Sequence, residues 1–206
     1  MKLYYSTGAC SLAPRIVLEE LGLPYQSERV DLRNRKTESG KDFRTINAKE
    51  VVPALELDNK EVLSECAVIL QYLAEQNPSK NLFPKHGTFE RYRGQEWLNF
   101  IATDLHRNFG VFFRPDTTEE MKTKFRHTVT SKLEHISAHV NGKTFLMGAQ
   151  FTVADAYLFT ILRWSENIGL DLTKWPKIMG YYETIYNRPS VQNALKHEGL
   201  LERKSA

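Results

Sequence analysis

The chain has 206 residues, of which 41% are hydrophobic and 26% are charged, and its formal net charge is +3. These values are ordinary for a globular protein with a packed core, and no apolar run approaches the roughly 20 residues that a membrane span needs. The basic residues are interleaved with acidic ones, which argues against a nucleic-acid groove. Two cysteines make no disulfide framework and no signal-peptide pattern is visible, so we expect a reducing, cytoplasmic setting.

Strand and helix patterns alternate over the first eighty residues. Ser11 and Ser64 are suitable N-caps for two helices, and Gly22 is a natural end for the first of them. Short strands separated by helices predict a small mixed sheet of four strands covered by helices. The expected strands are 2–6, 26–31, 54–57 and 60–63, and the expected helices are 12–21 and 65–76.

The composition changes at 77–87, which contains two prolines, a glycine and no clean period, and this segment is predicted to be a linker. The residues beyond it show only helical patterns. We therefore expect an α/β domain over 1–81 followed by an all-helical domain over 87–206. The helices expected in the second domain are 88–113, 118–140, 153–168, 175–187 and 190–198.

Cys10 lies between the first predicted strand and the first predicted helix. A thiol at the N-terminus of a helix is acidified by the free backbone N–H groups and the helix dipole, which predicts a reactive thiolate. The alternative is a small, buried apolar residue in a loop, and position alone weighs the two about equally.

Two further segments stand out. Pro53 precedes a predicted strand, where a missing N–H is tolerated, and the rarity of cis X–Pro bonds favours a trans bond at this point. Glu65 and Cys66 fall at a helix start, whose free N–H groups form an anion site, although simple capping is the more common explanation.

An uncharged polar stripe runs along the first helix of the second domain. Asn99, Thr103 and His106 are spaced i, i+4 and i+7, next to an apolar stripe, and this pattern favours a cleft over a solvated face. Thr152 and Asp155 fit a capping box, which indicates a structural role.

A metal site is not expected. His135 and His139 are spaced as in helical metal pairs, but the apolar positions of their helix leave both nearer solvent, so surface histidines are the better interpretation.

Together these features resemble the bacterial beta-class glutathione S-transferases over the whole chain. The resemblance implies a thioredoxin-like N-terminal domain followed by an all-helical domain, in a homodimer. It also implies conjugation of reduced glutathione to small hydrophobic electrophiles. The likeness is carried by Gly8-Ala9-Cys10-Ser11, Val52-Pro53, Ser64-Glu65, Asn99 with His106, and residues 151–155.

The resemblance also assigns roles to residues. Cys10 and His106 would be catalytic, with Cys10 facing the glutathione sulfur and able to form a mixed disulfide. The backbone of Val52, before a proline that the family holds cis, would pair with the cysteinyl unit. Glu65 would hold the γ-glutamyl end and Arg35 the glycyl carboxylate. The implied glutathione-binding residues are Cys10, Arg35, Val52, Pro53, Glu65, Cys66, Asn99, Thr103, Asp104 and His106. The candidate walls of an electrophile site are Phe109, Phe112, Phe113 and Trp164, each of which also suits an ordinary core.

Cys66 departs from the family pattern, which typically has serine there. A thiol hydrogen-bonds more weakly than a hydroxyl, so lower glutathione affinity is expected, and a Cys10–Cys66 disulfide stays open. A thioredoxin-type enzyme would carry a resolving cysteine three residues after Cys10, where this chain has Ala13. Two alternatives to conjugation follow: a monothiol redox enzyme, and a non-catalytic glutathione-binding, ligand-binding or stress-regulatory protein on the same fold.

Overall fold

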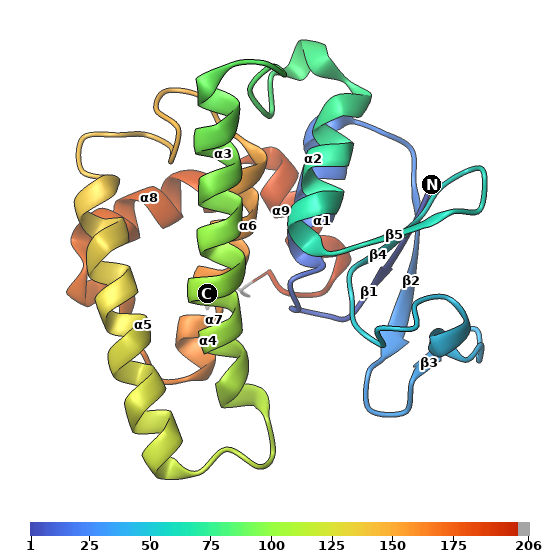
Figure 1. Cartoon of the computed structure of the whole chain (residues 1–206), viewed down its shortest axis with the longest axis horizontal. Helices are drawn as coiled ribbons and strands as arrows, with labels where there is room; N and C mark the ends of the chain where they lie inside the picture. The colour runs from blue at the N-terminus through green and yellow to red at the C-terminus, as the bar shows by residue number, and fades with distance from the viewer. Residues whose placement is uncertain (202–206) are drawn as a thin grey trace, which may run out of the picture. The chain divides into compact units, whose positions relative to one another are not determined.

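The computed structural model describes residues 1–201, which form two compact units (Figure 1). One unit comprises Met1–Lys80 together with the chain from Asn187 onward, and it is built on a β-sheet. The other comprises Asn81–Tyr186 and is helical.

The sheet has five strands in the order β3-β2-β1-β4-β5. β1 and β2 are parallel, whereas the other neighbouring pairs are antiparallel, so the sheet is mixed as expected. Four strands were predicted; the fifth, β3, has only two residues and lies at an edge, too short to give a periodic pattern. The strands are β1 Lys2–Tyr5, β2 Gln26–Asp31, β3 Lys36–Thr37, β4 Ala54–Glu56 and β5 Val62–Ser64.

Both faces of the sheet are buried at the central strands β1 and β4. Tyr4 pairs with Ala54 across β1 and β4, and both pack in a cluster with Phe43 from the 3₁₀ helix Phe43–Thr45. Leu3 and Leu55, the neighbouring pair, point to the opposite face because strand side chains alternate, and both are fully buried. The packed side chains on both faces therefore hold the ends of β1 and β4 in fixed positions.

Three helices belong to this unit: α1 (Leu12–Leu21), α2 (Cys66–Gln76) and α9 (Pro189–His197). α1 packs against α2 and, along its length, against α9. The first helix ends at Gly22 in the left-handed conformation, with φ 65°, as predicted. A short 3₁₀ turn, Pro78–Lys80, follows α2.

The position of α9 differs from the predicted domain limits, which assigned 87–206 to one helical domain. Glu198, directly after α9, accepts a hydrogen bond from Arg15 of α1 at 3.0 Å, and both side chains are almost completely buried. Glu20 of α1 contacts Arg188 and Ser190. These polar contacts fasten α9 to α1, so the end of the chain groups with the sheet unit.

The helical unit confirms the first four helical segments predicted after the linker, and the fifth, 190–198, is α9 of the sheet unit. A nearly continuous helix runs from α3 (Phe89–Phe100) through a π-helical turn, Ile101–His106, to α4 (Arg107–Gly110) and a 3₁₀ turn, Val111–Phe113. The remaining elements are α5 Glu119–His139, α6 Val153–Leu162, α7 Trp164–Asn167, the 3₁₀ turn Leu172–Lys174, and α8 Pro176–Tyr186.

Helix α6 is the centre of the helical unit, because every one of its residues is buried. Thr152 and Asp155 form the predicted capping box. Asp155 also accepts hydrogen bonds from Leu146 N–H and the Tyr181 hydroxyl, both at 2.8 Å. Burial raises the pKa of its carboxyl, while these donors oppose the shift. Asp155 is therefore structural.

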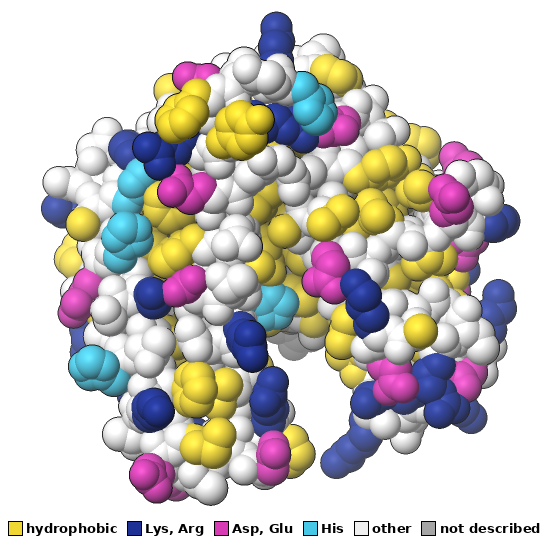
Figure 2. Space-filling model, viewed as in Figure 1, with side chains coloured by type: hydrophobic (Ala, Val, Ile, Leu, Met, Phe, Trp, Pro, Cys, Tyr) yellow, Lys and Arg dark blue, Asp and Glu magenta, His cyan; other side chains and the backbone are white. Residues whose placement is uncertain are grey.

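Charged side chains are interspersed with hydrophobic ones on the face shown in Figure 2. No helix within residues 1–201 has the length and apolar character needed to cross a bilayer. The large hydrophobic residues that are most exposed are Val51, Val62, Val68, Phe89, Tyr92, Phe113 and Met121.

Candidate functional site

The loop between β1 and α1 holds Cys10 in a fixed place. Ser11 does not cap α1 as predicted; its hydroxyl instead donates to Ser6 O and accepts from Ser6 N–H, both at 3.2 Å. On the other side, Gly8 N–H donates to the Glu198 carboxylate at 2.8 Å. The loop is therefore hydrogen-bonded both to Ser6, directly after β1, and to Glu198, directly after α9.

Cys10 is buried, with 6% of its surface exposed, and this overturns the expectation of an acidified thiol. Loss of solvent around the sulfur raises the pKa of Cys10 to about 12. Backbone N–H groups at the start of α1 lower it, as the sequence suggested, but by less, and the negative charge of Glu65 raises it further. The resting Cys10 is a protonated thiol.

The Cys10 thiol donates a hydrogen bond to the carbonyl oxygen of Val52, with a sulfur–oxygen distance of 3.2 Å. Val52 is itself buried, and the Val52–Pro53 peptide bond is cis, as the family resemblance implied and contrary to the general preference for trans. Pro53 directly precedes β4, where its missing N–H leaves no ladder bond unmade.

Glu65 and Cys66 lie where β5 passes into α2. The predicted N-cap, Ser64, is the last residue of β5, and Glu65 takes the cap position with φ 72°, a left-handed conformation that is uncommon for glutamate. The Glu65 side chain is 59% exposed and pairs with Lys49 at 2.7 Å. Cys66 is buried, and its thiol lies 3.6 Å from the carbonyl oxygen of Cys10.

Strand topology explains why these three segments meet. β4 runs antiparallel to both β1 and β5, so β1 and β5 run in the same direction. The ends of β1 and β5, and the beginning of β4, therefore lie at one end of the sheet. Cys10 follows β1, Val52–Pro53 precedes β4, and Glu65–Cys66 follow β5, which brings all three together.

Arg35 lies in the turn between β2 and β3 and has φ 56°. Its side chain is half-exposed and pairs with Glu50 at 2.6 Å. Glu50 also has a positive φ, 60°, and precedes Val51 and Val52 in the chain. Two neighbouring residues of this segment, Lys49 and Glu50, thus carry the charges that pair with Glu65 and Arg35.

In the helical unit, the predicted polar stripe begins at Asn99 near the end of α3 and continues into the π-helical turn. The Thr103 hydroxyl lies 3.0 Å from Asn99 O and 2.9 Å from the Asp104 carboxylate, two acceptors that share its one proton. Lys132 of α5 pairs with Asp104 at 2.6 Å, and hydrogen bonds hold the pKa of this carboxyl below its usual range. The wider π turn alters the α-helical register assumed from the i, i+4, i+7 spacing. π turns recur at functional sites.

His106 ends this π turn and lies among aromatic rings. Its Nδ1 is 2.6 Å from the hydroxyl of Tyr157 on α6, and its ring packs edge-on against Trp164 with centroids 5.0 Å apart. Trp164 also packs against Phe109 and Phe113, whereas Phe112 lies under Arg126 instead. Three of the four predicted aromatic candidates thus share one cluster with His106.

Several residues around these sites were missed from the sequence. Glu198, Tyr157 and Lys132 contact the Cys10 loop, His106 and Asp104 respectively. Each is far from its partner in sequence, and no local pattern distinguishes it from its neighbours. Only the fold reveals these roles.

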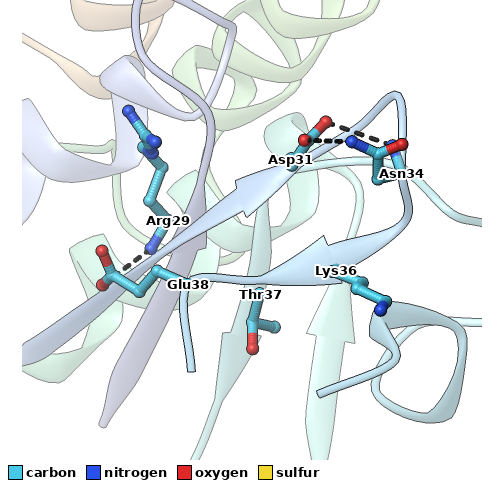
Figure 3. A pocket seen from close by; sticks show the side chains of 6 residues that line it. All are labelled: Arg29, Asp31, Asn34, Lys36, Thr37 and Glu38. Atoms are coloured by element: carbon cyan, nitrogen blue, oxygen red, sulfur yellow. Dashed lines mark hydrogen bonds between the residues drawn. The ribbon is translucent and has the colours of Figure 1, made fainter. Parts of the chain in front are cut away.

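The other parts of the described chain show fewer features of a functional site. No cluster of three or more His, Cys, Asp or Glu within the described residues could hold a metal ion. A polar hollow of about 390 Å³ lies beside β2 and β3 (Figure 3). There Glu38 accepts from Arg29 N–H and Asp31 from the Asn34 amide, so its acidic groups are internally paired. His139 packs against Trp97, with centroids 4.4 Å apart.

Comparisons with known proteins agree over nearly the whole chain. A family model described as glutathione S-transferase, N-terminal domain, matches residues 7–76, and one described as glutathione S-transferase, C-terminal domain, matches residues 100–189. Glutathione S-transferase GstA of Escherichia coli O157:H7 is 42% identical, and the match covers 97% of this chain and 100% of the relative.

Solved structures give the same result. A sphingomonad glutathione S-transferase complexed with glutathione has a TM-score of 0.94 and 42% identity, covering 98% of this chain and 100% of that chain. A bacterial beta-class enzyme of Sphingomonas chungbukensis has a TM-score of 0.95 and 42% identity at the same coverage. With its thioredoxin-like first domain and helical second domain, this chain belongs to the glutathione S-transferase family.

Proposed function

We propose that this protein conjugates reduced glutathione to small hydrophobic electrophiles. The observation that carries the proposal is the convergence of Cys10, the cis Val52–Pro53 bond and Glu65 at one end of the sheet. The irregular segment that leads into β4, next to the N-terminus of α2, suits an extended peptide that ends in a carboxylate. The complex of the sphingomonad relative with glutathione supports the same ligand.

In this proposal each part of glutathione has a partner in the sheet unit. The backbone of Val52 pairs with the cysteinyl residue like an added strand. Glu65 receives the γ-glutamyl ammonium group, and Arg35 the glycyl carboxylate. An ammonium group at Glu65 also offsets the negative charge that raises the pKa of Cys10, so bound ligand favours a thiolate at this end of the sheet.

The helical unit contributes the remaining groups. We assign glutathione contacts to Asn99, Thr103, Asp104 and His106, with His106 donating a hydrogen bond to the sulfur. Holding thiolate and electrophile in contact contributes to the rate enhancement. The aromatic side chains that would hold the electrophile are Phe109, Phe113 and Trp164, which pack together, and Phe112.

Replacing Glu65 tests the site. Glu65→Gln removes the charge and keeps the shape, so we expect glutathione affinity to fall by about 1.5–3 kcal/mol, the usual contribution of a charged hydrogen bond, with the thermal midpoint little changed. Calorimetric titration with glutathione and initial rates with an aryl halide measure both effects. Glu120→Gln, an exposed change in α5, is the matched control. Equal affinities of the two variants would contradict the assignment.

Thiol–disulfide exchange at Cys10 is a second candidate activity, favoured by the contact of the Cys10 sulfur with Val52. Cys10 would attack a glutathione mixed disulfide, and a further glutathione would release it. Cys10→Ala is then expected to lose reduction of a glutathionylated substrate and to keep conjugation of the aryl halide. Loss of both activities would mean that Cys10 organises the glutathione site itself.

A non-catalytic binding or regulatory protein is the competing proposal on this fold. It predicts glutathione binding with neither conjugation nor exchange, or no glutathione binding at all. We propose a cytoplasmic location, because two cysteines that form no disulfide fit a reducing compartment.

We also propose a homodimer, supported by large apolar side chains that reach solvent on α2 and α3. Val68 is 45% exposed on α2, and Phe89 and Tyr92 on α3 are 66% and 63% exposed. Sedimentation equilibrium of wild type and Phe89→Glu tests this state, since a monomeric wild type would refute it.

A further inference from the structure

Two reduced cysteines lie side by side in the sheet unit. Cys66 is the first residue of α2, and its sulfur is 3.6 Å from the backbone carbonyl oxygen of Cys10. Cys10 directs its own thiol to Val52 O at 3.2 Å. Neither cysteine forms a disulfide and both are 6% exposed. Each thiol is therefore buried and hydrogen-bonded to the backbone of a neighbouring segment, and the Cys66 sulfur contacts the Cys10 residue itself.

The fold keeps this arrangement in place. Cys10 precedes α1, which follows β1, and Cys66 begins α2, which follows β5. The strands β1 and β5 run in the same direction. α1 and α2 also pack against each other. A disulfide needs Cα atoms within about 7 Å and suitable rotamers. The contact of the Cys66 sulfur with the Cys10 carbonyl oxygen, at 3.6 Å, brings the two residues into neighbouring positions.

Position 13 cannot supply a second thiol. The resolving cysteine of a thioredoxin-type motif would stand three residues after Cys10, and there α1 has the buried Ala13. Cys66 contacts the Cys10 loop from a segment that is distant in the sequence. The chain therefore has a pair of thiols without the three-residue spacing of a thioredoxin-type motif.

We propose that Cys66 is the resolving thiol for Cys10, which gives this protein a dithiol–disulfide activity with glutathione disulfide as oxidant. This inference rests on the proposed glutathione site at Cys10.

The exchange proceeds in two balanced steps. The Cys10 thiolate attacks one sulfur of glutathione disulfide, forming a Cys10–glutathione bond and releasing one glutathione thiolate, which takes up a proton. Cys66, after losing its proton, then attacks the Cys10 sulfur, forming the Cys10–Cys66 disulfide and releasing the second glutathione. The protein dithiol is oxidised by two electrons and glutathione disulfide is reduced by two.

The reverse steps restore the enzyme. Two glutathione molecules reduce the internal disulfide in turn and leave as glutathione disulfide. While the internal disulfide lasts, the Cys10 thiol is absent from the proposed glutathione site, so the ratio of reduced to oxidised glutathione would set the fraction of competent enzyme.

Intact-mass spectrometry tests the proposal on the full chain. Wild type, Cys66→Ser and Cys10→Ser are incubated with glutathione disulfide without oxygen, alkylated and weighed. We expect wild type to lose two hydrogens and retain no glutathionyl group, and Cys66→Ser to accumulate one glutathionyl group on Cys10. Peptide mapping should join residues 10 and 66 within one chain. Cys10→Ser should form no internal disulfide.

The two variants identify the attacking thiol, and the pH dependence of the rate tests its ionisation. Because burial raises the pKa of Cys10 to about 12, its exchange should accelerate about tenfold per pH unit through the neutral and mildly alkaline range. A stable glutathionyl group on wild type, equal to that on Cys66→Ser, would overturn the resolving role. Absence of modification on both would overturn the inference together with exchange at Cys10, whereas conjugation of an aryl halide by the same samples would leave the main proposed function standing.

Discussion

Glu198 shows how one residue links the end of the chain to the Cys10 loop. Its two carboxylate oxygens accept from Gly8 N–H at 2.8 Å and from the Arg15 guanidinium at 3.0 Å. Arg15 also lies 4.2 Å from the Tyr5 ring centroid and donates to Tyr25. A buried cation with one carboxylate partner depends strongly on that partner, because water does not replace it.

Glu198→Gln is therefore expected to lower the free energy of unfolding by about 3–5 kcal/mol, since it leaves the Arg15 charge buried without its counter-ion. Urea denaturation followed by circular dichroism measures the change. Glu119→Gln, which breaks an exposed pair with Lys122 on α5, serves as control and should cost less than about 1 kcal/mol. Equal costs for the two variants would contradict a buried ion pair at Arg15.

At the scale of an element, two helical glycines have opposite surroundings. A Cβ atom on Gly94 of α3 would lie 2.6 Å from the Phe83 ring, whereas on Gly180 of α8 it would meet nothing within 4 Å. Phe83 is buried and its ring is covered by Arg91, so the ring has little room to move. Close packing against Phe83 therefore explains the glycine at position 94, whereas no neighbouring atom explains the glycine at position 180.

These surroundings predict that a glycine-to-alanine substitution changes the free energy of unfolding in opposite directions at the two positions. Gly180→Ala should raise the free energy of unfolding by about 0.5–1 kcal/mol, because alanine has the higher helix propensity. Gly94→Ala should lower it by about 1–3 kcal/mol, because the added methyl group overpacks the contact with Phe83. Paired urea denaturation curves give both values. If Gly94→Ala proved as stabilising as Gly180→Ala, the close approach of Phe83 would be wrong.

Local patterns in the sequence predicted the elements well and their surroundings poorly. The helices of the second unit and the capping box at Thr152 follow from periodicity and from residue types close in the chain. The two-residue strand β3 and the docking of α9 on α1 depend on partners distant in sequence. The position of Cys10 at a helix start was predicted, but its raised pKa was not, because desolvation comes from the folded surroundings.

At the scale of the whole molecule, several buried acids share one property. Burial is the largest cause that raises the pKa of Cys10 to about 12, and it also raises the pKa of Tyr4, Tyr25 and Tyr181 well above the usual phenol value. Hydrogen bonds to carboxylates, from Tyr4 to Glu56 and from Tyr181 to Asp155, act in the same direction. The protonated forms are thus favoured by both units of the folded chain.

Stability should consequently fall in alkali. The unfolded chain loses protons from cysteine above about pH 8.5 and from tyrosine above about pH 10, while the folded chain retains them. The folded state therefore binds more protons in this range, and the free energy of unfolding decreases as pH rises, by about 1.4 kcal/mol per pH unit for each group involved. Below about pH 8 these groups are protonated in both states and contribute no slope.

Urea denaturation between pH 7.5 and 10.5 measures this slope. Because the unfolded cysteine ionises above about pH 8.5 while the folded Cys10 thiol keeps its proton up to a pKa of about 12, Cys10→Ala should lose less stability than wild type above pH 8.5, and the difference between the two curves should widen through pH 10.5. Identical slopes for both proteins from pH 8.5 to 10 would mean that the Cys10 thiol is solvated in the folded state, which would remove the basis for a protonated resting thiol at this site.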